Sequence, residues 1–74
     1  MKILNYSIDE EFETAHVLTD EGMYFIFPFL IKGQYRFTSS ENYYKLYRDS
    51  SKMIKVEAEN ITEAFKTVEK WCQK

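Results

Sequence analysis

The sequence predicts an α+β fold, in which an antiparallel β-meander of about four or five strands is followed by a C-terminal amphipathic helix that packs on one sheet face. Three observations predict this fold. Apolar and polar side chains alternate through much of the first half of the chain, which is the period of a half-buried strand. Short turn sequences separate the alternating segments, and from residue 61 the apolar period becomes helical.

The predicted meander occupies the first half of the chain. Its four strands are expected over residues 2–8, 12–19, 23–31 and 34–38. Leu4, Tyr6 and Ile8 alternate with polar side chains in the first strand, and Gly22 permits a tight turn before the third. The third strand, MYFIFPFLI, contains Pro28, which cannot donate a ladder hydrogen bond. A bulge or kink is therefore expected at Pro28.

The second half changes period twice. A short helix is predicted near residues 40–48, a strand over 54–58 and a helix over 61–73. Tyr43, Leu46 and Tyr47 share one helical face in the first of these. Asn60 precedes the last helix and resembles an N-cap. That helix has one apolar face, formed by Ile61, Ala64, Phe65, Val68, Trp71 and Cys72.

The expected strand pairing gives the sheet two apolar faces. Tyr24, Ile26 and Leu30 are predicted beneath the C-terminal helix, with Leu18 on the same side. The opposite face is predicted to carry Ala15 and Val17 together with an aromatic stripe, formed by Phe25, Phe27 and Phe29. Either the short helix closes over this stripe, or the stripe stays open to a protein partner or a second copy in a homodimer.

Length and composition limit the remaining choices. The 74 residues form a single domain, 1–74, whose small core buries about 60–65% of the unfolded surface. Hydrophobic residues make up 45% and charged residues 30%, which excludes a disordered chain. The N-terminus lacks the pattern of a signal peptide, and the longest apolar run is too short to span a membrane. We therefore expect a soluble, cytoplasmic protein that does not contact a membrane.

Charge is distributed unevenly along the chain. Residues 1–31 carry one Lys against six acids, whereas residues 32–55 carry six bases against two acids. Acidic side chains gather in two predicted turns, Asp9-Glu10-Glu11 and Asp20-Glu21, and Glu13 follows the first of them. Either opposite charges meet across neighbouring strands, or the chain presents differently charged surfaces to its partners.

No catalytic constellation is recognisable. His16 is the only histidine and Cys72 the only cysteine, and their spacing gives no reason to pair them. The acidic turns lack the pattern of a Ca²⁺ loop, and the two glycines form no phosphate-binding loop. We therefore expect no enzyme activity, no cofactor and no metal.

The leading hypothesis is a small, non-enzymatic protein-interaction module. Its expected partner-binding residues are Phe25, Phe27, Phe29, Glu10, Glu11, Asp20 and Glu21. Small acidic proteins without motifs often serve as accessory or inhibitory factors, including those of phages and mobile elements. That expectation is general and comes from no particular residue.

Single-stranded nucleic-acid or nucleotide binding is the alternative, because segment 32–55 interleaves aromatic rings with cations. The candidate residues for it are Lys32, Arg36, Tyr44, Lys45 and Arg48. Against it, the pI is near 5.3, and the acidic turns would repel phosphates unless they lie on the far side. Tyr43 and Tyr47, at helical spacing, are more typical of a core than of a stacking surface.

Overall fold

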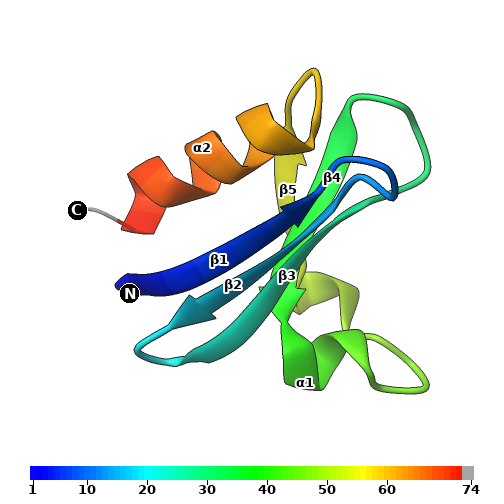
Figure 1. Ribbon diagram of the computed structural model, residues 1–74. Helices are drawn as coiled ribbons and strands as arrows, with labels where there is room; N and C mark the ends of the chain where they lie inside the picture. The colour runs from blue at the N-terminus through cyan, green and yellow to red at the C-terminus, as the bar shows by residue number, and fades with distance from the viewer. Residues whose placement is uncertain (73–74) are drawn as a thin grey trace.

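The computed structural model of the chain describes residues 1–72 and confirms the α+β class. Five strands form one antiparallel sheet in the order β1-β2-β3-β4-β5, as the meander requires (Figure 1). The strands span Ile3–Asp9 (β1), Thr14–Thr19 (β2), Gly22–Pro28 (β3), Gln34–Ser39 (β4) and Ile54–Glu57 (β5). The helices are α1, Ser40–Tyr43, and α2, Ile61–Cys72, with a 3₁₀ turn, η1, at Ser50–Lys52. Residue 73, where the last helix was predicted to end, lies outside the described residues.

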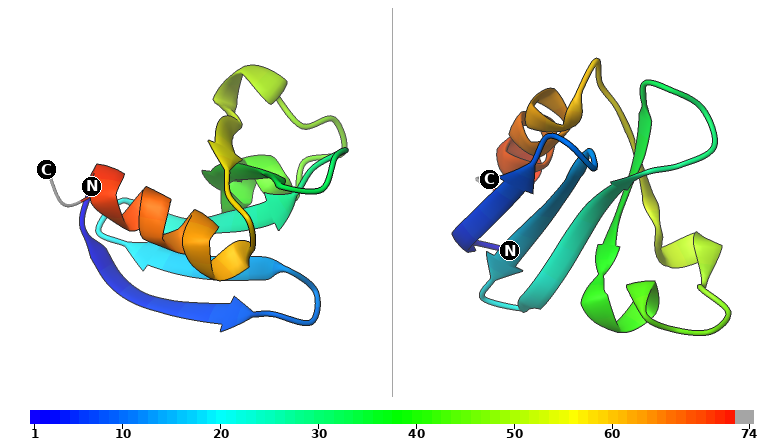
Figure 2. Two further views of the ribbon diagram at one scale, coloured as in Figure 1. Left: turned by 90° about the horizontal axis from the view of Figure 1, so that it is seen from above. Right: turned by 45° about the vertical axis from the view of Figure 1, so that its right-hand side comes forward.

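The two helices cover opposite faces of the sheet (Figures 1 and 2). The main core lies between the sheet and α2, and its strand side consists of Ala15, Val17, Ile26, Tyr35, Phe37 and Val56. From α2 it receives Ile61, Ala64, Phe65 and Val68. Each of the larger side chains contributes about 1.5–3 kcal/mol by leaving water. No helix of residues 1–72 is long and apolar enough to span a membrane.

The α2 helix begins where the sequence predicts it. The Asn60 side-chain oxygen accepts from the Glu63 backbone N–H at 2.9 Å, which satisfies one of the free donors of the first turn. The Glu63 carboxylate lies 3.5 Å from the Lys66 ammonium, one turn further along. The helix is therefore fixed at its start by a side-chain cap and along its length by its buried face.

The third strand is the central one, but it is shorter than predicted. It ends at Pro28, which pairs with Tyr35, so the missing N–H lies at a strand end and no bulge is needed there. Phe29 closes the following loop by donating its N–H to the Gln34 carbonyl at 3.1 Å. The irregularity in the sheet lies instead in β1, between Ile3 and Asn5.

The second strand faces the other way from the prediction. Ala15 lies opposite both Ile8 and Ile26, so Ala15 and Val17 belong to the α2 core, and Leu18 lies on the other face. The cause is the length of the first turn. A first turn one residue longer than expected reverses the face of β2, because side chains alternate along a strand. The second turn is one residue shorter than expected, since Thr19 pairs with Gly22, and this returns β3 to its predicted faces.

The Tyr35 side chain links the core to the first turn. It is 2% exposed, and its hydroxyl donates to a Glu13 carboxylate oxygen at 2.9 Å. Burial, and then the Glu13 hydrogen bond, raise its pKa from 10.0 to about 12. A raised pKa in the folded state means that this stabilisation is complete below pH 10 and is lost as the pH rises through 12.

We expect Tyr35→Phe to lower the free energy of unfolding by about 1 kcal/mol at pH 7, because it removes the hydrogen bond to Glu13 but keeps the buried aromatic ring. The difference from wild type should shrink as the pH rises from 10 to 12. Urea denaturation across this pH range measures it. A difference that stays constant would contradict the role of the Tyr35 proton.

Candidate functional site

The aromatic stripe of the sheet is closed rather than open. Phe25 and Phe27 are 8% and 6% exposed. The Tyr43 ring of α1 meets both edge-on, with ring centroids 4.7 Å and 5.0 Å away. Phe29 lies just beyond β3 and is half-buried. The stripe that motivated a sheet-face partner or homodimer is therefore part of a second, smaller core under α1.

A loop over residues 43–49 completes this second core, and a single buried side chain braces it. Asn42 is 2% exposed. Its amide nitrogen donates to the Asp49 carbonyl at 3.1 Å, and its oxygen accepts from the Asp49 N–H at 2.8 Å. The same nitrogen donates to the Thr38 hydroxyl at 2.9 Å. The Asn42 side chain thus pairs with both the N–H and the carbonyl of Asp49, at the far end of the loop.

The helix predicted near residues 40–48 ends at Tyr43. Its first turn is capped by the Ser39 hydroxyl, but the Asn42 side chain turns to Asp49 seven residues later. The chain then leaves the helix, so that of the three side chains expected on a buried face only Tyr43 packs on the sheet. Leu46 and Tyr47 are 89% and 86% exposed, and Tyr44 is 74% exposed.

Cations accompany the rings on this surface. The Arg48 guanidinium lies 4.4 Å from the Tyr43 ring centroid and donates to the Tyr43 carbonyl at 2.9 Å. Arg36 lies 4.5 Å from the Phe29 ring centroid. Of the five predicted nucleic-acid contacts, Tyr44, Lys45 and Arg48 share the 43–49 loop. Arg36 lies in the neighbouring strand β4, and Lys32 lies beyond the other end of that strand.

The first acidic turn presents an aromatic ring. The Asp9 carboxylate accepts from the N–H groups of Glu11 and Phe12, at 3.0 Å and 3.2 Å. Glu13 then adopts a positive φ of 54°, so the turn occupies residues 10–13. Phe12 was predicted in a strand, but it is 69% exposed, between Glu11 and Glu13.

The loop after β3 is the second connection at this end of the sheet, and it lines a shallow pocket together with Glu13. The Ile31 N–H donates to the Phe29 carbonyl at 2.7 Å, which closes a three-residue γ-turn around Leu30. Leu30 has a φ of 62°, a strained value for a residue with a side chain. Leu30, predicted in the core, is 88% exposed, and Ile31 is 63% exposed.

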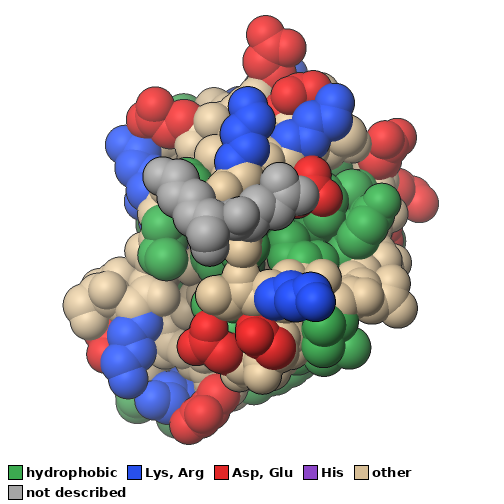
Figure 3. Space-filling view, turned by 90° about the vertical axis from the view of Figure 1, so that its left-hand side faces the viewer, with side chains coloured by type: hydrophobic (Ala, Val, Ile, Leu, Met, Phe, Trp, Pro, Cys, Tyr) green, Lys and Arg blue, Asp and Glu red, His purple; other side chains and the backbone are tan. Residues whose placement is uncertain are grey.

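The second acidic turn is separated from the first by the length of β2. Asp20 accepts from the Lys2 backbone N–H at 2.8 Å, and Glu21 lies 3.5 Å from the N-terminal amine. Figure 3 views the molecule from this side and shows acidic, basic and hydrophobic side chains interspersed. Asp20 and Glu21 thus hold the N-terminus and do not join Glu10 and Glu11 in one surface.

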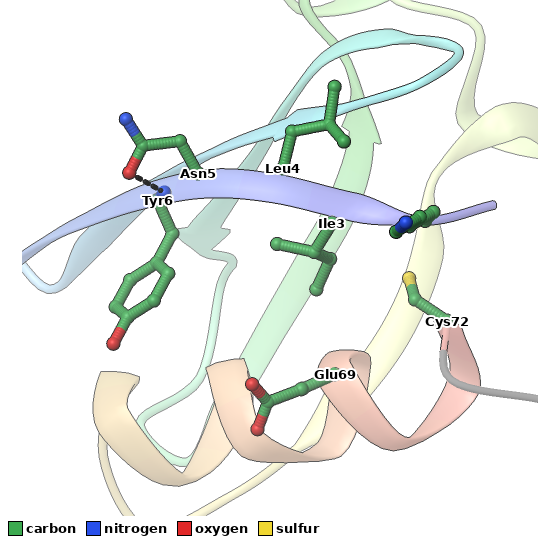
Figure 4. A pocket seen from close by; sticks show the side chains of 7 residues that line it. Ile3, Leu4, Asn5, Tyr6, Glu69 and Cys72 are labelled. Carbon is green, nitrogen blue, oxygen red and sulfur yellow. Dashed lines mark hydrogen bonds between the residues drawn. The ribbon is translucent and has the colours of Figure 1, made fainter.

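A groove of about 370 Å³ separates β1 from α2. Figure 4 shows Ile3 and Tyr6 pointing toward α2, whereas Leu4 and Asn5 both point away, as a bulge requires. The Asn5 side-chain oxygen accepts from the Tyr6 N–H at 2.8 Å. The bulge and this hydrogen bond make the edge of β1 a poor template for another strand.

The reactive residue types are kept apart. His16 extends from the α1 side of the sheet, where its ring lies 4.6 Å from that of Phe25, whereas Cys72 packs against the core on the α2 side. Burial raises the pKa of the Cys72 thiol, which keeps it protonated and a poor nucleophile. Residues 1–72 contain no group of three His, Cys, Asp or Glu side chains that could hold a metal.

Comparison of the chain with protein families, curated proteins and solved structures finds no match. Sequence reasoning identified Glu10, Glu11, Tyr44, Lys45 and Arg48 as candidate contacts. It missed Phe12, Leu30, Leu46 and Tyr47, because their spacing is that of buried side chains.

We expect Asn42→Ala to lower the free energy of unfolding by about 2 kcal/mol, because it leaves the buried partners of the amide without hydrogen bonds. Amide hydrogen exchange at Asp49 should accelerate more than exchange in β2. The neighbouring exposed substitution Glu41→Ala, as a control, should change stability by less than about 0.5 kcal/mol. Equal effects of the two substitutions would contradict the bracing role of Asn42.

Proposed function

We propose that the chain is a small, non-enzymatic protein-interaction module that binds a basic protein surface through its acidic end, defined as Glu10, Glu11, Phe12, Leu30 and Ile31. The observation that carries this proposal is the exposure of Phe12, Leu30 and Ile31, at 69%, 88% and 63%. They lie on two connections at the same end of the sheet (Figures 1 and 2). Anchors of this kind typically dominate the energy of protein interfaces.

Burial of these three side chains against a partner would contribute on the order of 5 kcal/mol before the costs of association. The connections that carry them are held by hydrogen bonds to the Asp9 carboxylate and from the Ile31 N–H to the Phe29 carbonyl. Little conformational freedom would therefore be lost on binding. A preorganised surface retains more of its contact energy as affinity.

The charge of the acidic end selects the chemistry of the partner. Glu10 and Glu11 are exposed in the first turn, and Glu10, Glu13 and Glu63 line a shallow pocket beside the start of α2. Acidic side chains around apolar anchors favour a partner with Lys or Arg at its rim and increase the rate of encounter. They also oppose pairing of two acidic ends in a homodimer.

The exposed anchors of the acidic end would act by contact alone and need no chemical step. An accessory or inhibitory factor is the corresponding proposal for its biology. Such a factor acts by occupying a surface of its partner, and for that role the exposed anchors and fixed turns suffice.

We expect Phe12→Ala and Leu30→Gly each to weaken partner binding at least tenfold, because each removes an anchor. Leu30→Gly should leave the free energy of unfolding unchanged or raise it by up to about 1 kcal/mol, since glycine accepts the positive φ. The immobilised chain would first capture its partner from a host extract. Titration with the purified partner then measures the affinity of each variant.

Tyr47→Ala is the matched control, because it removes a ring that is even more exposed than Phe12 and lies at the opposite end of β4. It should leave the affinity unchanged. Glu10→Lys combined with Glu11→Lys should slow association and reverse its dependence on salt. A partner that tolerates Phe12→Ala and Leu30→Gly, or a homodimer in light scattering that Phe12→Ala dissociates, would contradict the proposal.

A further inference from the structure

The 43–49 loop displays a second, chemically different surface. Tyr44 and Tyr47 are 74% and 86% exposed, and each is followed directly by a cation, Lys45 and Arg48. Aromatic rings beside cations are the two components that single-stranded nucleic-acid sites combine, because rings stack on bases and cations contact phosphates. The loop carries both within five consecutive residues.

The Tyr44 ring and the Arg48 guanidinium of this loop are held in place. The Tyr44 ring packs edge-on against Phe25 and Tyr43, with centroids 5.5 Å and 5.2 Å away. Arg48 is fixed by its hydrogen bond to the Tyr43 carbonyl. The base of the loop is closed by Asn42 and Asp49. A stacking surface that is already ordered loses little entropy when bases bind.

The charge around this loop favours a polyanion. The segment that contains it carries six bases over residues 32–55, and its acids are Glu41 and Asp49. The Asp49 carboxylate is turned to the backbone N–H and hydroxyl of Ser51. The acidic turn at Asp20 and Glu21 engages the N-terminal residues, and the turn at Glu10 and Glu11 lies at the opposite end of β2.

We propose that the 43–49 loop binds single-stranded nucleic acid, with bases stacked on Tyr44 and Tyr47 and phosphates held by Lys45 and Arg48. Arg36 extends the surface along β4, where it covers the Phe29 ring. An acidic peptide would use the cations but leave the exposed rings without a stacking partner. This site is separate from the acidic end and does not rest on the protein-binding proposal.

The experiment is a fluorescence-anisotropy titration of the intact chain with labelled ten-nucleotide oligo-dT and oligo-U at low and moderate salt. Two or three phosphate contacts predict a slope of about −1.5 to −2 in log affinity against log salt. Tyr47→Ala should weaken binding about tenfold, whereas Tyr47→Phe, which keeps the ring, should bind as wild type. Lys45→Gln should reduce the slope by about 0.7.

Phe12→Ala is the matched control, since it removes an exposed ring at the acidic end. It should not change oligonucleotide binding. No binding at low salt, or binding that persists unchanged in Tyr47→Ala, would overturn the proposal. Competition by an oligo-glutamate peptide as strong as that by unlabelled oligonucleotide would also overturn it, and would assign the loop to acidic proteins instead.

Discussion

The 74 residues of this chain have to bury both faces of a five-stranded sheet. The α2 helix covers one face with a continuous apolar side. The other face is covered by a single helical turn and a loop, and these can close over Phe25 and Phe27 only because Asn42 binds both backbone groups of Asp49. The buried Asn42 amide thus holds in place the loop that covers the second core, a face that a second long helix would cover in a larger protein.

The short length of α1 and of the loops determines which side chains reach solvent. A helix of one turn cannot bury every apolar residue near it, so Leu46 and Tyr47 project outward from the braced loop. At the other end of the sheet, the connection between β1 and β2 and the connection between β3 and β4 are also short. They expose Phe12 and Leu30. The molecule therefore carries two sets of exposed large side chains, one among carboxylates and one among cations.

Local signals in the sequence are enough to predict much of the fold. Asn60 and the apolar period behind it locate α2, and alternation locates the strands and their order. Two features depend on hydrogen bonds that periodicity does not reveal. The Asp9 carboxylate lengthens the first turn and reverses the face of β2. Asn42 ends α1 by binding Asp49, which exposes Tyr47 at a spacing typical of a core. Charged candidate contacts such as Glu10 and Arg48 can be recognised in the sequence. The exposure of the large apolar side chains beside them, such as Phe12 and Leu30, is seen only in the structure.

We conclude that α1 and the braced loop close the second face of the sheet. The most direct test compares Phe27→Ala with Phe12→Ala by urea denaturation, because the two rings are 6% and 69% exposed. Loss of a buried ring should lower the free energy of unfolding by about 3–5 kcal/mol in Phe27→Ala. The change in Phe12→Ala should stay within about 0.5 kcal/mol. Equally small effects would mean that the aromatic stripe is open to solvent and would contradict the claim.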